Sequence, residues 1–474
     1  MKNIYLLLVV IFCLMAIIST NAIQAKNIEG IWEGKLHVPG SSLRIVFKVS
    51  RTPEGKLTAS MDSPDQGVTG IRVDEVLLQD NNLSMEITAI AGIYEGIISH
   101  DYSEIEGDWK QAGASFSLLL QKVEKAVEIS RPQEPKRPFP YIEEGVKYEN
   151  IEAGIILAGT LTLPDKEGSF PAVILISGSG PQDRDETVFG HRPFLVLADY
   201  LTSQGIAVLR VDDRGVGEST GDFSQATSKD FASDVQAGIE YLKKREEINP
   251  SQIGLIGHSE GGLIAPMVAV QSPDVAFIVL MAGPGLPGED ILYMQNELIS
   301  RVAGMSEEKI DRNHYYNEKL YSLIKAEENE EILIKKATSI FYEYFTELTQ
   351  EERNQIGDRD EYVDVQLQNM LSPWFKFFLT YDPRPTLSKV SCPVLAIIGS
   401  KDLQVPPKKN LKAIEEALIA GDNKNHLIKE LPDLNHVFQT AETGSPDEYA
   451  RIEETISLVA LELTRDWILE QTNS

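Results

Sequence analysis

Cysteine is scarce in this chain, with only Cys13 and Cys392 among 474 residues. So few cysteines exclude a fold held by a network of disulfides, and stability must come from packing. Basic side chains are also in short supply, 44 against 72 acidic ones, which gives a formal net charge of −28. Nucleic acid and anionic membrane surfaces would repel such a chain, so neither is an expected partner.

A long apolar run occurs at the N-terminus, "MKNIYLLLVVIFCLMAIISTNAIQA". One early cation, Lys2, precedes the run, and small polar residues follow it, which is the pattern of a secretory signal peptide. The run is short for a membrane span of about 20 residues. We therefore expect residues 1–25 to be cleaved off near Ala22 or Ala25, without stable membrane insertion afterwards. The mature protein would be secreted or periplasmic in a bacterial envelope, with Cys392 as its one cysteine.

The remaining length suits two or three domains. Residues 27–125 alternate apolar and polar side chains in short runs such as "SLRIVFKVS" and "LSMEITAI", which predicts a small all-β, barrel-like domain. Trp32 and Trp109 are expected to plug its core, the alternative being that they line a ligand mouth. "RPQEPKRPFP" marks residues 126–146 as a proline-rich linker.

From residue 147 to 474 strands alternate with helices. "PAVILIS", "IAVLRVD", "IGLIGHS", "AFIVLMAG" and "PVLAIIGS" are apolar runs typical of buried parallel strands. The fold class is therefore α/β, a mostly parallel sheet with helices on both faces. Between about residues 287 and 385 the pattern becomes purely helical. This insertion lies before the last two strands, at the edge of the sheet where ligands bind, and is well placed to be a lid.

The pattern G-x-S-x-G occurs twice, in "GHSEGG" around Ser259 and in "GESTG" around Ser219. A nucleophilic serine of the elbow type needs a buried strand before it, a helix after it and small residues around the turn. Ser259 has all three, whereas Ser219 lies in a glycine-rich loop with no helix nearby. Ser259 is the predicted nucleophile, and Ser219 is expected to tie its loop together.

A nucleophilic serine needs a base and an orienting acid, which in this arrangement follow it along the chain as acid and then histidine. Three histidines lie beyond Ser259: His314, His426 and His436. Only His436 lies in a loop just past a strand, so it is the predicted base. Asp402, in "PVLAIIGSKDLQVP", is the predicted acid. Its rival Asp433 is too close to His436 along the chain to reach the far ring nitrogen.

The oxyanion of the reaction needs two N–H donors. One should be the backbone N–H of Glu260, the residue after Ser259. The other should come from "ISGSGPQDRDE", where Ser179 is favoured and Gly180 and Gln182 are alternatives. Pro181 is excluded because proline has no N–H. The charges of "QDRDE" are expected to pair as a loop wall, the alternative being that Arg184 touches substrate.

With these residues assembled, the chain from about residue 141 to its end resembles the α/β-hydrolase superfamily. "FPAVILISGSGPQDRDE", "VLRVDDRGVGESTG", "GLIGHSEGG" and "GSKDLQVP" are similar to a bacterial serine carboxylesterase branch of EstD type. The resemblance implies esterase activity on short acyl esters. It also implies that the loop of residues 214–219 supports the site without doing chemistry.

The predicted function is hydrolysis of a small carboxylic ester through an acyl-enzyme, with no metal or organic cofactor. A serine peptidase or aminopeptidase, or an acyl thioesterase, would use the same three residues. A ligand-binding protein on a degenerate hydrolase scaffold is the non-enzymatic alternative. Aromatic residues of the insertion are expected to pack its helices, although they would also suit an acyl chain: Phe341, Tyr344, Phe345, Trp374, Phe375 and Phe378.

Overall fold

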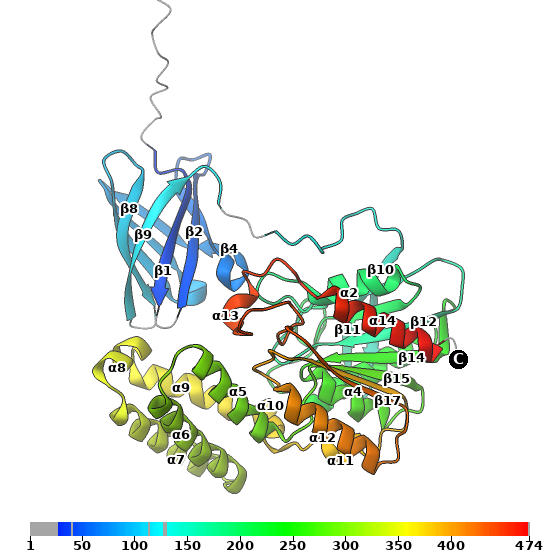
Figure 1. Cartoon of the computed structure of the whole chain (residues 1–474). Coiled ribbons are helices and arrows are strands. Elements are labelled where there is room, and N and C mark those ends of the chain that lie inside the picture. The colour runs from blue at the N-terminus through cyan, green and yellow to red at the C-terminus, as the bar shows by residue number, and fades with distance from the viewer. Residues whose placement is uncertain (1–26, 39–40, 112–113, 127–129, 473–474) are drawn as a thin grey trace, which may run out of the picture.

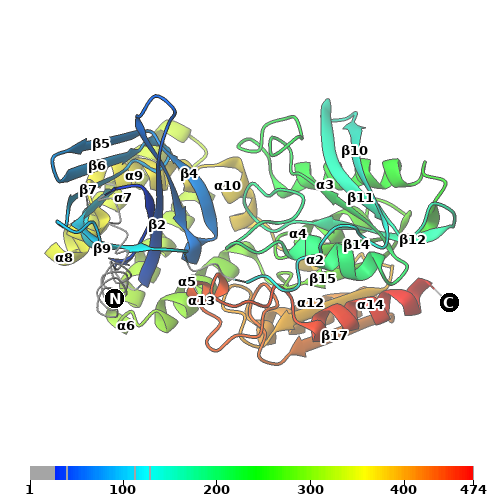
Figure 2. The ribbon, with the colours of Figure 1, turned by 90° about the horizontal axis from the view of Figure 1, so that it is seen from above.

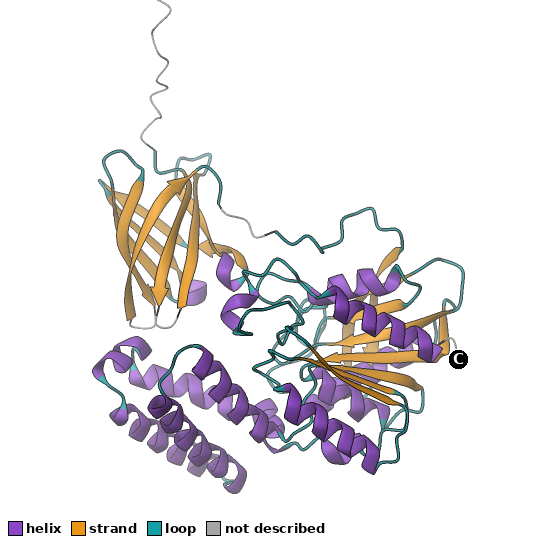
Figure 3. Cartoon of the chain, viewed as in Figure 1, coloured by secondary structure: helices purple, strands orange, loops and turns teal. Residues whose placement is uncertain are grey.

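The computed structural model describes residues 27–38, 41–111, 114–126 and 130–472 (Figure 1). The predicted signal peptide lies outside these residues. An antiparallel β domain comes first, and an α/β unit with a helical insertion follows it (Figures 1 and 3).

The N-terminal domain is a nearly closed antiparallel barrel. Its strands in the described residues are β1 (Gly30–Val38), β2 (Ser41–Arg51), β3 (Leu57–Ser63), β4 (Val68–Val73), β5 (Glu75–Gln79), β6 (Asn82–Ile87), β7 (Gly92–Ile98), β8 (Glu104–Gln111) and β9 (Ala114–Val123), with 3₁₀ turns η1 (Pro64–Gln66) and η2 (Thr88–Ile90). They pair in the order β4-β3-β2-β1-β9-β8-β7-β6-β5. The edge strands β4 and β5 are consecutive in the chain and lie close to β6 and β3 respectively, so the sheet curls back on itself. The barrel-like prediction is confirmed.

The barrel interior is filled by side chains. Trp32 is 0% exposed and Trp109 is 2% exposed, and both belong to the core cluster of this domain. The indole N–H of Trp32 donates to the carbonyl of Ile28 at 2.7 Å, which satisfies its polar atom inside the core. Both tryptophans are therefore core plugs, as expected, and they do not line a ligand mouth.

The two domains are joined by close backbone contacts. A Cβ atom on Gly67 of the barrel would lie 1.8 Å from the backbone nitrogen of Gly190 in the α/β unit, so only glycine fits. Arg131, after the barrel, donates to the carbonyls of Gly190 at 3.0 Å and Ala450 at 2.6 Å. The sheet of the second domain begins at Ile142, inside the segment that the sequence assigned to the linker.

The α/β unit contains an eight-stranded mixed sheet in the described residues. Its strands are β10 (Ile142–Asn150), β11 (Ile155–Leu163), β12 (Phe170–Ile176), β13 (Ala207–Val211), β14 (Ile248–His258), β15 (Val275–Met281), β16 (Val394–Gly399) and β17 (His426–Leu431). They pair in the order β10-β11-β13-β12-β14-β15-β16-β17. The pairs β10–β11 and β11–β13 are antiparallel, and the other neighbouring strands pair in parallel. The α/β prediction is confirmed.

Helices cover both faces of this sheet, as Figure 1 shows. One face packs on α3 (Ser228–Leu242), α4 (Gly261–Ala269) and α12 (Pro407–Ala420). The other face packs on α2 (Pro193–Thr202) and α14 (Leu458–Thr472), and the short α13 (Pro446–Tyr449) lies in a connecting loop. The central strands are buried on both sides, which explains their unbroken apolar sequences.

The helical insertion interrupts the sheet between β15 and β16. It consists of α5 (Gly288–Val302), α6 (Glu307–Ala326), α7 (Glu330–Glu347), α8 (Gln350–Ile356), α9 (Arg359–Met370), α10 (Pro373–Thr380) and α11 (Arg384–Leu387). Phe341 and Phe345 are buried in it, and Tyr344 bonds to Asn313 within it. These aromatic residues pack the helices, as expected. The barrel lies over the insertion and beside the α/β unit (Figure 2), and α8 contacts β9.

None of the helices in the described residues is both long enough and apolar enough to cross a bilayer.

Candidate active site

Ser259 stands on a sharp turn between β14 and α4. Its φ angle is 52°, in the left-handed region that a serine adopts only under constraint. Its N–H donates to the carbonyl of Met281 at 2.8 Å. A Cβ atom on Gly257 would lie 2.0 Å from the carbonyl oxygen of Gly261, so the turn requires glycine there. The predicted elbow is the local structure that this sequence forms.

His436 and Asp402 reach Ser259 from the loops that follow β17 and β16. The Nε2 atom of His436 lies 3.0 Å from the Ser259 hydroxyl, and its Nδ1 atom lies 2.8 Å from a carboxylate oxygen of Asp402. The other oxygen of Asp402 accepts the N–H groups of Gln404 and Val405, each at 2.8 Å. Asp402 is 2% exposed and His436 is 4% exposed. The ring is thus held in one orientation, away from water.

The rival residues lie elsewhere. His314, on α6, rests against the ring of Tyr293, with 4.7 Å between ring centroids. The Nδ1 atom of His426 bonds to the carbonyl of Asn423 at 2.9 Å. Asp433 forms a surface ion pair with Lys401 at 3.1 Å. The fold brings together the three predicted residues and leaves these three apart from them.

The loop after β12 lies against the elbow. A Cβ atom on Gly178 would be 3.2 Å from the Cβ of Ser259. The Gly178 N–H donates to Glu186 at 2.7 Å, and the Gln182 N–H donates to Asp213 at 3.0 Å. The backbone N–H of Gln182 is therefore already used and is not available to an oxyanion.

Within the described residues no acceptor takes the backbone N–H of Ser179, Gly180 or Glu260. Ser179 and Gly180 both remain as sources of the second oxyanion donor, beside Glu260 as the first.

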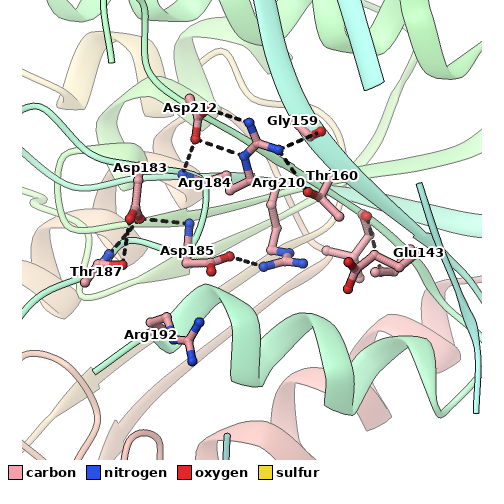
Figure 4. Close-up of polar contacts among 12 residues, drawn as sticks. Glu143, Gly159, Thr160, Asp183, Arg184, Asp185, Thr187, Arg192, Arg210 and Asp212 are labelled. Atoms are coloured by element: carbon pink, nitrogen blue, oxygen red, sulfur yellow. Dashed lines mark hydrogen bonds and ion pairs between the residues drawn. The ribbon is translucent and has the colours of Figure 1, made fainter. Parts of the chain in front are cut away.

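The charges of this loop pair with residues of β13 and of the loop that follows it, as Figure 4 shows. Arg184 forms a two-pronged contact with Asp212, at 3.0 and 2.6 Å, and also donates to the carbonyl of Gly159. Asp185 pairs with Arg210. The expected charge-paired wall is confirmed, and the guanidinium of Arg184 makes its hydrogen bonds within this wall.

Ser219, the serine of the second G-x-S-x-G pattern, ties its loop to the sheet. Its hydroxyl donates to the carbonyl of Asp212 at 2.7 Å and accepts the N–H of Ala158 at 2.9 Å. Arg214 in the same loop pairs with Asp234 at 2.8 Å. The loop supports the fold, as expected.

The chain is similar in sequence or in fold to several known proteins. The family model "Serine aminopeptidase, S33" matches residues 192–350. The chain is 29% identical to esterase EstD of Thermotoga maritima over 388 residues, which cover 80% of this chain and 83% of that protein. An uncharacterised 31.7 kDa protein of Escherichia coli is 26% identical, covering 57% of this chain and 85% of its own length. The α/β hydrolase GrgF of Penicillium overlays with a TM-score of 0.42 at 16% identity, covering 70% of this chain and all of its own.

The chain belongs to the α/β-hydrolase superfamily. Its sheet order, its elbow and its sequence similarity to an esterase all agree with this assignment.

Glu260 of this α/β hydrolase has a side chain whose role the sequence did not reveal. It is 2% exposed and accepts a hydrogen bond from the Ser228 hydroxyl at 2.6 Å. The indole N–H of Trp374, on α10 of the insertion, lies 2.8 Å from both of its oxygens. Burial raises the pKa of Glu260, and these hydrogen bonds partly oppose the rise. The insertion thus touches the residue next to Ser259.

Two further titratable groups of the hydrolase were missed. His258, just before Ser259, has its Nδ1 atom 2.9 Å from Glu186 and its Nε2 atom 3.0 Å from the carbonyl of His436. Asp213 accepts from the Ser177 hydroxyl at 2.9 Å, and burial raises its pKa to about 7. The sequence showed these residues beside the motifs, but only the fold places them against the site.

Proposed function

We propose that this α/β hydrolase is a serine carboxylesterase that cleaves esters of short acyl chains through an acyl-enzyme on Ser259. His436 acts as the general base and Asp402 as the acid that orients it. The observation that carries the proposal is the hydrogen-bonded series from the Ser259 hydroxyl through His436 to Asp402, at 3.0 and 2.8 Å. Such a series activates a hydroxyl that is otherwise a weak nucleophile.

In acylation, His436 takes the hydroxyl proton through Nε2 while the Ser259 oxygen attacks the ester carbonyl carbon. Asp402 stabilises the imidazolium that forms. The negative charge on the carbonyl oxygen is held by the N–H of Glu260 and by a second N–H from the loop after β12, for which we propose Ser179 over Gly180. His436 then gives its proton to the leaving alcohol, and the acyl group stays on Ser259.

Deacylation repeats these steps with water. His436 removes a proton from the water, whose oxygen attacks the acyl carbon. The oxyanion is held as before, and the proton returns to the Ser259 oxygen as the carboxylic acid leaves. The chain's own side chains supply every proton transfer in this cycle.

One observation supports an ester substrate, and another supports a short acyl chain. The similarity to an esterase covers 80% of the chain. The indole of Trp374 bonds to Glu260, the residue next to Ser259, and we infer that this ring limits the length of the acyl group. A methylene that does not fit an apolar pocket costs about 1–3 kcal/mol in discrimination.

An aminopeptidase is the second candidate, because the matching family model carries that description. Such an enzyme needs a carboxylate to bind the substrate's ammonium group. Glu260 is the carboxylate next to Ser259, and its oxygens already accept hydrogen bonds from Ser228 and Trp374. This favours an ester over an aminoacyl amide.

The deciding experiment measures hydrolysis of p-nitrophenyl esters of increasing acyl length by the wild type and by Ser259→Ala. Ser219→Ala is the matched control, since it removes the serine of the other motif. We expect turnover to be lost in Ser259→Ala and to stay within the same order of magnitude in Ser219→Ala. Equal rates in wild type and Ser259→Ala would end the proposal.

The same panel includes aminoacyl p-nitroanilides and acyl thioesters. We expect the acetyl or butyryl ester to have the highest kcat/KM. A higher kcat/KM on an aminoacyl anilide would replace the esterase proposal with the peptidase, and a higher value on a thioester would replace it with the thioesterase.

A further inference from the structure

His258 and Glu186 form a buried pair beneath the candidate active site. The His258 side chain is 10% exposed and that of Glu186 is 4% exposed. His258 Nδ1 lies 2.9 Å from Glu186 Oε1, and His258 Nε2 lies 3.0 Å from the carbonyl oxygen of His436. Neither side chain belongs to the series that activates Ser259.

The partners of His258 indicate its charge. A carbonyl oxygen can only accept a hydrogen bond, so Nε2 must carry a proton. A carboxylate also only accepts, so Nδ1 must carry one as well. A neutral imidazole has a single N–H and would leave one contact unmade, whereas an imidazolium makes both. Burial lowers the pKa of His258, but Glu186, the carbonyl of His436 and the charge of Asp402 together raise it by more, in agreement with this reading.

His191 is a second buried histidine with different partners. Its Nδ1 atom lies 2.8 Å from the Thr455 hydroxyl, which can donate or accept, so a single ring N–H suffices. Burial lowers the pKa of His191 to about 4, as expected for a neutral ring. The contrast shows that burial alone does not charge a histidine in this protein. The carboxylate of Glu186 makes the difference.

The pair connects three segments that the proposed chemistry requires. Glu186 accepts the Gly178 N–H at 2.7 Å, which fixes the peptide just before Ser179. His258 directly precedes Ser259 in the elbow. The carbonyl that His258 contacts belongs to His436. The His258–Glu186 pair thus connects the loop that carries Ser179, the turn that carries Ser259 and the loop that carries His436.

The backbone of Glu186 is unusual in the same way as that of Ser259. Its φ angle is 51°, in the left-handed region, which costs a non-glycine residue of order 1 kcal/mol or more. In this conformation the carboxylate accepts the N–H of Gly178 and contacts Nδ1 of His258. The charge of Asp402 adds to the attraction for a cation at His258.

We propose that the His258–Glu186 ion pair positions the oxyanion loop and His436 relative to Ser259 for the esterase reaction described above, on which this inference rests. Both are positioning residues, because they act through Gly178 and His436 and not on the substrate. Their loss lowers kcat and leaves KM nearly unchanged, because the transition state needs the aligned N–H groups and base.

The first test measures the charge directly and needs no activity. The protein has seven histidines, so ¹⁵N spectra of histidine-labelled wild type at neutral pH can be assigned by loss of a signal in His258→Gln and in His191→Gln. We expect the His258 signal to be that of an imidazolium and the His191 signal to be that of a neutral ring. A neutral His258 would overturn the inference even if the enzyme is fully active.

The second test measures kinetics of Glu186→Gln and Glu186→Ala, with His191→Gln as the matched buried-histidine control. Misplacing reacting groups by about 1 Å costs up to about 10²-fold. We expect kcat to fall by about that factor in Glu186→Ala and less in Glu186→Gln, whose amide oxygen can still accept the Gly178 N–H. His191→Gln should stay near wild type.

Wild-type kcat in Glu186→Ala would overturn the positioning role, and so would a loss of activity that appears in KM alone. If wild type and Ser259→Ala are equally inactive, the esterase proposal fails first, and the positioning role fails with it. An active wild type that loses turnover in Ser259→Ala but not in Glu186→Ala rejects only the present inference.

Discussion

The indole N–H of Trp374 bonds to both carboxylate oxygens of Glu260 at 2.8 Å, so the helical insertion is fastened to the residue after Ser259. Trp374 also stacks on Phe378 of the same helix, with 5.3 Å between ring centroids. These contacts tie α10 to the residue beside the candidate nucleophile.

Trp374→Ala should shift the preference toward longer acyl chains. Removing the ring opens space for several methylenes, so the ratio of kcat/KM for octanoyl to acetyl ester should rise by about tenfold or more. Trp374→Phe keeps most of the bulk and loses only the hydrogen bond, so its ratio should remain near that of the wild type. An unchanged ratio in Trp374→Ala would show that this ring does not limit the acyl group.

Asp402→Asn should abolish most turnover without unfolding the site. The Asn oxygen can still accept from Gln404 and Val405, but its NH₂ group would face His436 Nδ1 and favour the wrong tautomer. A loss of about 10⁴-fold in kcat is expected for such a change. The control is Asp433→Asn, at the surface pair with Lys401, which should keep wild-type kcat. Comparable turnover in the two variants would contradict the role of Asp402.

Asp213→Asn should change how stability depends on pH. Burial raises the pKa of Asp213 from 3.8 to about 7. The folded protein therefore binds a proton more tightly than the unfolded chain, and this group's contribution to stability falls as pH rises from about 4 to about 7. The penalty at neutral pH is about 2–4 kcal/mol.

The measurement is denaturant unfolding of wild type and Asp213→Asn at pH 5 and pH 8. The free energy of unfolding of the variant, relative to wild type, should be higher at pH 8 than at pH 5. The reverse order, or no difference between the two pH values, would contradict the raised pKa.

Arg184→Gln should destabilise the fold by about 3 kcal/mol, because it leaves the buried carboxylate of Asp212 without its charged partner. Lys147→Gln is a suitable control, since Lys147 pairs with Glu218 where both side chains are about 60% exposed, and such exposed pairs contribute little to stability. Thermal or urea unfolding measures both. Equal effects of the two substitutions would mean that the Arg184 contact is worth no more than a surface pair.

The N-terminal segment gives a prediction that is independent of the site. If residues 1–25 form a signal peptide, the protein expressed with its own N-terminus in a bacterium should lose them, and its mature N-terminus should lie just after Ala22 or Ala25. Mass spectrometry of periplasmic and membrane fractions reads this directly. An intact N-terminus in the membrane fraction would contradict cleavage.

Local pattern was enough for much of the architecture. Buried parallel strands leave a signature of unbroken apolar residues, and alternation marks half-buried ones, so both sheets could be predicted. The strand, turn and helix around Ser259 were visible because glycines at 257 and 261 are required by backbone contacts. The start of the second sheet at Ile142 was not visible, since its β10 edge strand "IEEGVKYEN" is polar and follows the proline-rich stretch directly.

The sequence by itself determined the fold class and the three residues that the fold brings together at Ser259. Their types, order and position after strands are local features, and parallel strands deliver their carboxyl ends to one edge of the sheet. Only the tertiary structure decided what lies around them. Trp374 comes 115 positions after Ser259 and Glu186 comes 72 before His258 in sequence number, and no periodicity links such distant residues. Their hydrogen bonds arise because helices and loops pack against the same edge, which is a property of the folded chain alone.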